Sequence, residues 1–300
     1  MGMTRVAFQG VHGAYSELAA RFLIDKGGKT AGGARTIPCE SFDEVFRSVE
    51  RGSAQRGVIP IENSLAGSIH QNYDLLLKHG VHITGELHLR VEHVLMAGPG
   101  TSMKSLHTVR SHPQALAQCS RFFETHPGIR PEAFFDTAGA ALSLRGAGTA
   151  GVGAIASAYA AELYGLTVLR RNLENEPHNF TRFLLIARSP WKLRGGTPTK
   201  CSIAFRPASN TPGILFRILG VFSLRDIDLL KIESRPDPAS PFEYLFYLDL
   251  AGSPREPRVE RALAHLQEVV THYRLLGAYP MGSGRVYGAI KKRNFRSRRK

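Results

Sequence analysis

Three polar residues stand at the mouth of an apolar segment in the second half of the chain. Asn179, Thr181 and Arg182 lead into residues 183–187, FLLIA, which have the composition of a buried strand. Side chains alternate along an extended chain, so Asn179 and Thr181 point to one side and Arg182 to the other. An amide and a hydroxyl on one side suit a polar ligand, whereas the opposite direction of Arg182 favours a structural salt bridge.

Further polar residues occur where a strand-like segment ends and a helical segment begins, as at Asp136 and Thr137 in DTAG. In open α/β sheets, ligands bind at the carboxyl ends of the strands, where helix N-termini offer free N–H groups. Each such residue could serve only as a helix cap, which is the commoner role. Five such segments on one side of a sheet nevertheless predict a site for a small anion. Its expected hydroxyl and amide side chains are Ser16, Asn63, Ser64, Ser111, Gln114, Thr137 and Ser157.

The elements that position these residues alternate between strand-like and helical patterns from residue 4 to about 188. The strand-like RVAFQG, for example, is followed by the helical SELAARFLI. Such alternation predicts α/β layering with mostly parallel strands. Residues 189–199, SPWKLRGGTPT, are typical of a linker because they are rich in Pro, Gly and Thr. Residues 200–280 then follow the order βαββαβ, which predicts a ferredoxin-like domain.

The positive charge of the chain is concentrated at its end. The formal net charge is +14, but the last 20 residues hold eight Lys and Arg and no acid, which leaves +6 on residues 1–280. We expect residues 281–300 to be a disordered, solvated tail. Weak, salt-dependent binding of a polyanion is the alternative. Nucleic-acid binding would rest on this tail alone and is not expected, because the body lacks basic residues interleaved with aromatic ones.

The cysteines and the apolar runs indicate the compartment. Cys39, Cys119 and Cys201 are far apart and form neither a CxxC pair nor a disulfide framework, which favours a reducing cytoplasm. No apolar run approaches the ~20 residues of a membrane helix, and the N-terminus lacks the pattern of a signal peptide. We therefore expect a cytoplasmic protein without a membrane segment.

Other motifs that could indicate chemistry have simpler explanations. Residues 146–151, GAGTAG, match a dinucleotide-binding spacing but follow a helix and precede a strand, the reverse of the required context. Residues 88–93, HLRVEH, exceed a zinc motif by one residue and alternate like a strand. Cys119 could pair with His112 as a nucleophile, but an unpaired cysteine on a helix is more often packed in the core.

Taken together, these segments resemble prephenate dehydratase of the bacterial type with a C-terminal ACT domain, and they are similar to the plant arogenate dehydratases. The resemblance covers roughly residues 4–280 and leaves the basic tail outside. The matching motifs of the large unit are GVHGAYS (10–16), PIENSLAGSIHQNYDLL (60–76), SHPQALAQC (111–119), DTAGAA (136–141), AIASAYAAELYGL (154–166) and NFTRF (179–183). Those of the small unit are NTPGILF (210–216) and KIESRP (231–236).

The resemblance implies both a fold and a reaction. The fold is a two-lobed, periplasmic-binding-protein-like α/β catalytic unit over residues 4–188, with a middle lobe at about 80–178, followed by an ACT domain over 200–280. The reaction is the decarboxylative dehydration of prephenate to phenylpyruvate in phenylalanine biosynthesis. Aromatisation drives it, so no cofactor and no metal is expected. Arogenate, which has an amino group in place of the keto group, remains an alternative substrate.

The resemblance also implies roles for the residues of NFTRF. Thr181 is the expected catalytic residue, and its hydroxyl would donate a hydrogen bond to the departing hydroxyl group of the substrate. Asn179 would orient the substrate, and Phe183, on the same side of the strand, would wall the cleft. A non-catalytic amino-acid sensor with the same domains is an alternative, but a sensor would have no need of Thr181.

The ACT resemblance implies regulation by phenylalanine bound where two ACT domains meet. N–H groups at the start of the helix after residue 210 could face the carboxylate of this effector. Side chains at the end of the following strand could receive its ammonium group. The expected effector residues are Asn210, Pro212, Gly213, Leu215, Glu233 and Ser234. Because ACT domains commonly pair edge to edge, a homodimer or homotetramer is expected.

Overall fold

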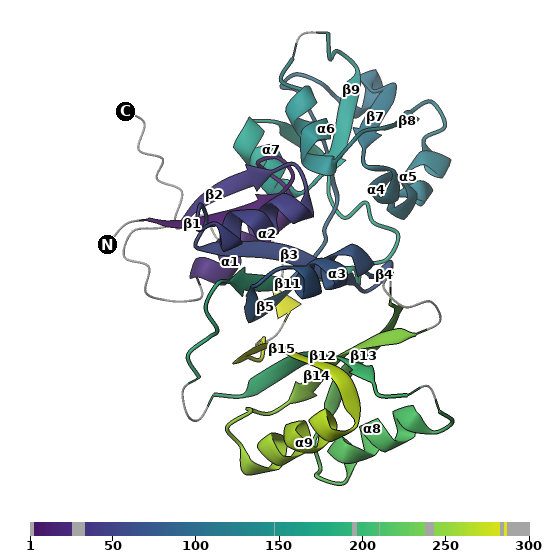
Figure 1. Ribbon diagram of the computed structural model, residues 1–300. Coiled ribbons are helices and arrows are strands. Elements are labelled where there is room, and N and C mark those ends of the chain that lie inside the picture. The colour runs from purple at the N-terminus through teal and green to yellow at the C-terminus, as the bar shows by residue number, and fades with distance from the viewer. Residues whose placement is uncertain are drawn as a thin grey trace.

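The protein folds into three sheets with helices packed against them (Figure 1). This computed structural model describes residues 3–25, 34–146, 148–193, 197–209, 211–237, 243–282 and 285–286. Two of the sheets are built from the part of the chain that resembles the catalytic unit, except for one short strand of the first sheet at residues 285–286. The third sheet follows the linker. In the described ranges, no helix is long and apolar enough to cross a membrane.

The first sheet has the strand order β16-β5-β11-β3-β1-β2, with β4 beside β3. Strand β11, which carries Thr181, is antiparallel to both neighbours and pairs Thr181 with Asn63 on one side and with Leu89 on the other. The strands are β1 (Thr4–Gln9), β2 (Ala34–Cys39), β3 (Arg56–Asn63), β4 (Gly67–Ser68), β5 (His82–Arg90), β11 (Phe180–Ala187) and β16 (Arg285–Val286). The helices of this lobe are α1 (Tyr15–Asp25), α2 (Phe42–Glu50) and α3 (His70–Lys78).

The second sheet has the order β10-β6-β9-β7-β8 and forms the middle lobe. Its strands are β6 (Val94–Ala97), β7 (Thr108–Ser111), β8 (Arg130–Ala133), β9 (Val152–Ala156) and β10 (Thr167–Arg170). Its helices are the 3-10 turn η1 (Met103–Ser105), α4 (Pro113–Gln118), α5 (Ser120–Thr125), α6 (Thr137–Ser143) and α7 (Ala158–Tyr164). Because β5 pairs with β11 in the first sheet, the chain crosses between the lobes after Arg90 and not near residue 80 as expected.

The third sheet forms the C-terminal domain and has the order β13-β14-β12-β15. Along the chain its elements are β12 (Thr199–Pro207), α8 (Ile214–Ser223), β13 (Leu229–Pro236), β14 (Tyr244–Ala251), α9 (Pro257–Glu268) and β15 (Val270–Pro280). This is the expected βαββαβ order, with both helices on one face of the sheet (Figure 1). Ile203, Phe205, Phe222 and Leu266 are buried between the helices and the sheet.

The expectation of a disordered tail is wrong at residues 285–286. Strand β16 pairs in parallel with β5, so that Arg285 lies beside His88 and Val286 beside Leu89. Strand β5 would otherwise be an edge of the first sheet, and the added strand covers that edge at His88 and Leu89. Residues 283–284 and 287–300 lie outside the described part of the chain.

The third sheet packs directly on the back of the first through strands β15 and β5 (Figure 1). The two backbones come so close at Gly277 that a Cβ atom there would lie 2.2 Å from the carbonyl oxygen of Ile83. Only glycine fits such an approach. The C-terminal domain is therefore seated on β5, which pairs with the strand that carries Thr181.

A buried ionic network joins the two domains at the strand that carries Thr181. Arg182 donates from Nε to Glu86 at 2.9 Å and forms an ion pair with Asp249 of the C-terminal domain at 2.6 Å. Lys200 reaches Glu86 at 3.0 Å, and Tyr279 accepts a hydrogen bond from Arg182 at 3.1 Å. The expected salt bridge of Arg182 is thus confirmed, with one of its acids supplied by the other domain.

The ionic network predicts a stability that depends on pH. Burial alone would raise the pKa of Glu86, but Arg182 and Lys200 outweigh burial and hold that pKa below its ordinary value. The stabilisation from Glu86 is therefore complete above the pKa of its unfolded state, ~4.3, and is lost as pH falls through the lower folded pKa. We expect the melting temperature of wild type to fall more steeply below pH ~4 than that of Glu86→Gln. Parallel curves for the two proteins would contradict this assignment.

Candidate functional site

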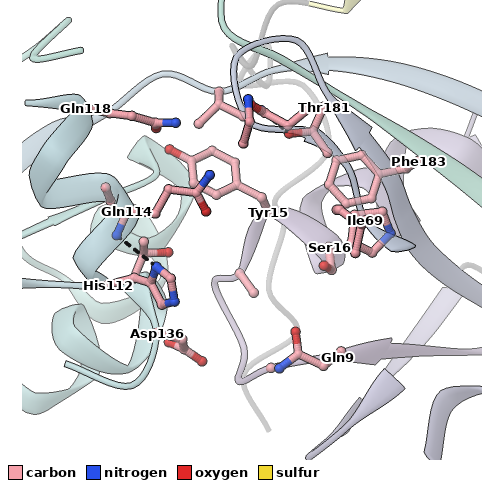
Figure 2. A pocket seen from close by; sticks show the side chains of 18 of the residues that line it. Gln9, Tyr15, Ser16, Ile69, His112, Gln114, Gln118, Asp136, Thr181 and Phe183 are labelled. Carbon is pink, nitrogen blue, oxygen red and sulfur yellow. Dashed lines mark hydrogen bonds between the residues drawn. The ribbon is translucent and has the colours of Figure 1, made fainter. Parts of the chain in front are cut away.

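A cavity of about 330 Å³ lies between the first and second sheets. Residues of both lobes line it, including residues at the ends of β1 and β7 or just after them, and residues at the start of β11 (Figure 2). Thr181 and Phe183 stand on the wall formed by the first lobe, as their shared side of β11 requires. The predicted site residues that line this cavity are Ser16, Asn63, Gln114, Thr137, Thr181 and Phe183.

Four other predicted residues do not line the cavity. The Ser111 hydroxyl donates to the carbonyl of Ile155 at 2.6 Å, and Ser64 donates to the carbonyl of His178 at 2.9 Å. Ser157 donates to the carbonyl of Gly13 at 3.0 Å. Asn179 is fully buried behind the cavity wall. The three serine hydroxyls each donate to a backbone carbonyl. In this structure they therefore stabilise the loops and do not face the cavity.

The hydroxyl of Thr181 is held by Asn63, which lies opposite it on β3. The Asn63 carbonyl oxygen accepts from the backbone N–H groups of Leu65 and Ala66 at 3.0 and 2.9 Å. Its amide nitrogen must therefore face β11, where it donates to Thr181 Oγ1 at 3.0 Å. Because Thr181 Oγ1 accepts this bond, the proton of the hydroxyl is free to be donated elsewhere. Thr181 is only 8% exposed, and its exposed part faces the cavity.

A chain of hydrogen bonds continues from Asn63 to the middle lobe. Asn63 Nδ2 lies 2.7 Å from Asn179 Oδ1, and Asn179 Nδ2 donates to Gln118 Oε1 at 3.1 Å. His93 Nε2 lies 3.0 Å from the same oxygen of Gln118, which requires that this nitrogen carries the proton. Burial lowers the pKa of His93, so the imidazole is neutral. Asn179 thus positions the groups around Thr181 from behind.

The loop that begins the first lobe is shaped by two glycines and a buried acid. Gly10 and Gly13 have φ angles of +106° and +93°, which residues other than glycine rarely adopt. The buried carboxylate of Glu17 accepts from the Gly13 N–H at 2.7 Å and from Thr36 at 2.8 Å. This loop places Ser16 at the N-terminal end of helix α1, facing the cavity.

Sequence reasoning missed several residues of the cavity wall. One of them is Gln118, which lies on the same face of α4 as the predicted Gln114, four residues earlier, so the spacing was a usable signal. His112 was considered only as a partner of Cys119, but its Nδ1 caps the N–H of Gln114 and its ring borders the cavity. Asp136 was predicted as a cap, and its carboxylate also borders the cavity (Figure 2).

Cys119 does not form a nucleophilic centre. Its side chain is fully buried, and burial raises the pKa of the thiol to about 12. A thiol with such a pKa is almost entirely protonated at neutral pH and therefore unreactive. Within the described ranges, no group of three or more His, Cys, Asp or Glu side chains is placed to hold a metal ion.

The predicted effector residues are divided between two faces of the C-terminal domain. Gly213 is the N-cap of α8 with a φ angle of +81°, and Pro212 before it is exposed. Leu215 is half-buried in the first turn of α8. Asn210 lies outside the described residues.

Glu233 and Ser234 do not act together, because neighbouring residues on strand β13 face opposite sides. Glu233 faces the catalytic unit, where it accepts from Ser68 at 2.6 Å and lies 3.0 Å from His70. Ser234 is exposed on the other side. The expectation that both receive one ammonium group is therefore wrong for this arrangement.

Two known protein families match the two parts of the chain, before and after the linker. Residues 6–190 match the family Prephenate dehydratase, and residues 208–266 match the family ACT domain. Arogenate dehydratase/prephenate dehydratase 1 of Arabidopsis thaliana is 44% identical over 291 residues, which are 92% of this chain and 72% of that protein. Arogenate dehydratase 2 of Petunia hybrida is 46% identical over 93% of this chain and 72% of its own length.

Two solved structures are also similar over nearly the whole chain. Prephenate dehydratase from Arthrobacter aurescens in complex with L-Phe is 28% identical, with a TM-score of 0.82, over 92% of this chain and 90% of that chain. GqqA, titled a novel type of quorum quenching acylases, is 36% identical, with a TM-score of 0.82, over 93% of this chain and 98% of that chain.

Proposed function

The chain belongs to the prephenate dehydratase family, and we propose that the cavity between its two lobes is the active site with Thr181 as the catalytic residue. The reaction converts prephenate to phenylpyruvate by loss of carbon dioxide and water. The observation that carries the proposal is the Thr181 hydroxyl, which Asn63 holds with its proton free to be donated into the cavity.

The chemistry needs a hydrogen-bond donor at one defined atom. When the bond between the ring and its carboxylate breaks, carbon dioxide leaves and the electron pair completes the aromatic ring. The ring hydroxyl, para to that carbon, leaves with its bonding electrons and becomes water on gaining a proton. Thr181 would donate a hydrogen bond to this hydroxyl as negative charge develops on it. A donor fixed in advance where charge develops costs no reorganisation during the reaction.

The cavity also suits the other requirements of the reaction. The backbone N–H groups at the start of α1, an eleven-residue helix, can receive a carboxylate. Phe183 and Ile69 supply apolar surface against which the ring can pack. Binding between two lobes fixes the orientation of both leaving groups and removes rotational freedom from the substrate.

Three alternatives are separated by turnover assays. A non-catalytic sensor would bind amino acids but release neither carbon dioxide nor water from the substrate. Arogenate would yield phenylalanine in place of phenylpyruvate. An acylase requires a nucleophile with an adjacent base, and around this cavity the Thr181 hydroxyl is bonded to the amide of Asn63, which is not a base.

Phenylalanine is the effector expected at the C-terminal domain, and the Arthrobacter aurescens structure is titled as a complex with L-Phe. We propose that phenylalanine binds near Gly213 and Leu215, between two copies of the domain. The outer side of β13 and helix α8 exposes Ile232 at 44% and Phe216 at 80%, apolar surface that a second copy could cover. A homodimer or homotetramer follows from this proposal, and a cytoplasmic location is supported by the free thiols of the three cysteines.

Titration with phenylalanine tests the regulatory part. Because the effector must bind the less active state more tightly, it should inhibit turnover and raise the melting temperature over the same range of concentration. Activity and thermal unfolding are measured in parallel, with 3-phenylpropionate as a matched control that lacks the ammonium group. An active, oligomeric protein that shows neither effect at millimolar phenylalanine would contradict regulation through this domain.

A further inference from the structure

The charges around the cavity do not match those of prephenate. Among the described residues that line it there is no lysine or arginine, and Asp136 is the one acid. Prephenate carries two carboxylates and no positive group at neutral pH. A carboxylate on the cavity wall repels such a dianion. Among the described lining side chains, the one near Asp136 that could carry positive charge is His112, whose Nδ1 accepts the backbone N–H of Gln114. Asp136 therefore favours a ligand that carries a positively charged group.

The position of Asp136 agrees with the shape of the substrate. In Figure 2, Asp136 and Gln9 lie at one end of the cavity, and Thr181 lies at the other. The ring hydroxyl and the three-carbon side chain are para to each other, so they occupy opposite ends of the substrate. When the hydroxyl contacts Thr181, the side chain extends toward Asp136.

The carboxylate of Asp136 is held in a fixed position by backbone groups of both lobes. It accepts hydrogen bonds from the N–H groups of Gly139 and Ala138 on its own helix and from the N–H of Val11 in the first lobe. A Cβ atom added to Gly10 would lie 3.5 Å from Asp136 Oδ2, so the carboxylate closely approaches the first lobe. These three bonds leave about one of the four lone-pair sites of an ionised carboxylate for a ligand.

We infer that Asp136 receives an ammonium group on the substrate side chain and makes the cavity select arogenate over prephenate. The inference rests on the proposed function and narrows it to one substrate class. Arogenate differs from prephenate only in carrying this ammonium group in place of the keto oxygen. Paired with Asp136, the ammonium removes the repulsion that prephenate meets.

The pKa of Asp136 is consistent with this assignment. Burial raises the pKa of its carboxyl, and the backbone N–H groups of Gly139 and Val11 offset burial only in part. The carboxylate thus lacks full compensation from the protein, and an ammonium ion on the ligand would supply it.

The test compares kcat/KM for the two substrates in wild type, Asp136→Asn and Asp136→Ser. Asparagine and serine both keep the helix cap and remove the charge. We expect wild type to have the higher kcat/KM with arogenate. In both variants kcat/KM for arogenate should fall by about 10- to 100-fold, while that for prephenate stays unchanged or rises. Glu132→Gln, which removes one charge from the same lobe outside the cavity, is the matched control and should keep the wild-type ratio.

The outcomes separate this inference from the proposed function. A wild-type enzyme with higher kcat/KM for prephenate overturns the inference even if neither variant folds. An equal loss with both substrates in folded variants also overturns it, because Asp136 would then act only as a cap. Absence of turnover with either substrate in wild type would instead refute the proposed function itself.

Discussion

The substitution Thr181→Ala should lower kcat by ~10²–10³-fold, because it removes the donor that faces the leaving hydroxyl. The change deletes a hydroxyl that, among the described residues, is bonded to the amide of Asn63, and that amide keeps Asn179 as an acceptor. The fold should therefore be retained, with a melting temperature close to that of wild type. KM should change little, since the lost interaction strengthens only as the hydroxyl departs.

The conservative variant distinguishes chemistry from packing. Thr181→Ser keeps the hydroxyl and removes one methyl group, so it should retain considerably more activity than Thr181→Ala. Steady-state rates of both variants are compared at saturating substrate, with circular dichroism as the check on folding. A folded Thr181→Ala protein with near wild-type kcat would refute the role given to Thr181.

Loss of the buried guanidinium in Arg182→Ala should lower the free energy of unfolding by about 3–5 kcal/mol. The substitution leaves Glu86 with Lys200 as its one remaining cation and removes the ion pair to Asp249. Both acids are nearly inaccessible to solvent, so water cannot replace the lost partner without opening the interface. The measurement is urea unfolding followed by a probe in each domain.

A surface ion pair provides the control for Arg182. Arg110 and Glu132 are 2.9 Å apart but partly exposed, and such pairs contribute only ~0–1 kcal/mol. Arg110→Ala should therefore change the free energy of unfolding by less than about 1 kcal/mol. If Arg182→Ala were no more destabilising than Arg110→Ala, the network would not hold the domains together.

Residue types and spacing were sufficient to predict the class of fold and the strand that carries Thr181. Alternation along residues 179–183 predicted that Thr181 and Phe183 face the cavity and that Arg182 faces away, and the structure agrees. The partner Asp249 lies 67 residues further along the chain, and local pattern cannot reveal a contact set by the packing of two domains.

The wrong predictions of site residues concern side chains that form hydrogen bonds to other groups of the protein. Ser111 and Ser157 were predicted to bind substrate because they follow strands, but each donates to a backbone carbonyl. A sequence shows that a hydroxyl is present and not which acceptor it meets. Glu233 was assigned to an effector for the same reason, whereas the tertiary fold places it against Ser68. The crossing after Arg90 likewise depends on which sheet accepts β5, a choice made by packing.

Turnover by the purified protein tests the central claim most directly. The protein is supplied with prephenate and, separately, with arogenate, and carbon dioxide and the aromatic product are measured together. The account predicts equimolar release of carbon dioxide and phenylpyruvate from prephenate, or phenylalanine from arogenate, with both lost in Thr181→Ala. A folded, oligomeric wild-type protein that releases no carbon dioxide from either substrate would contradict it.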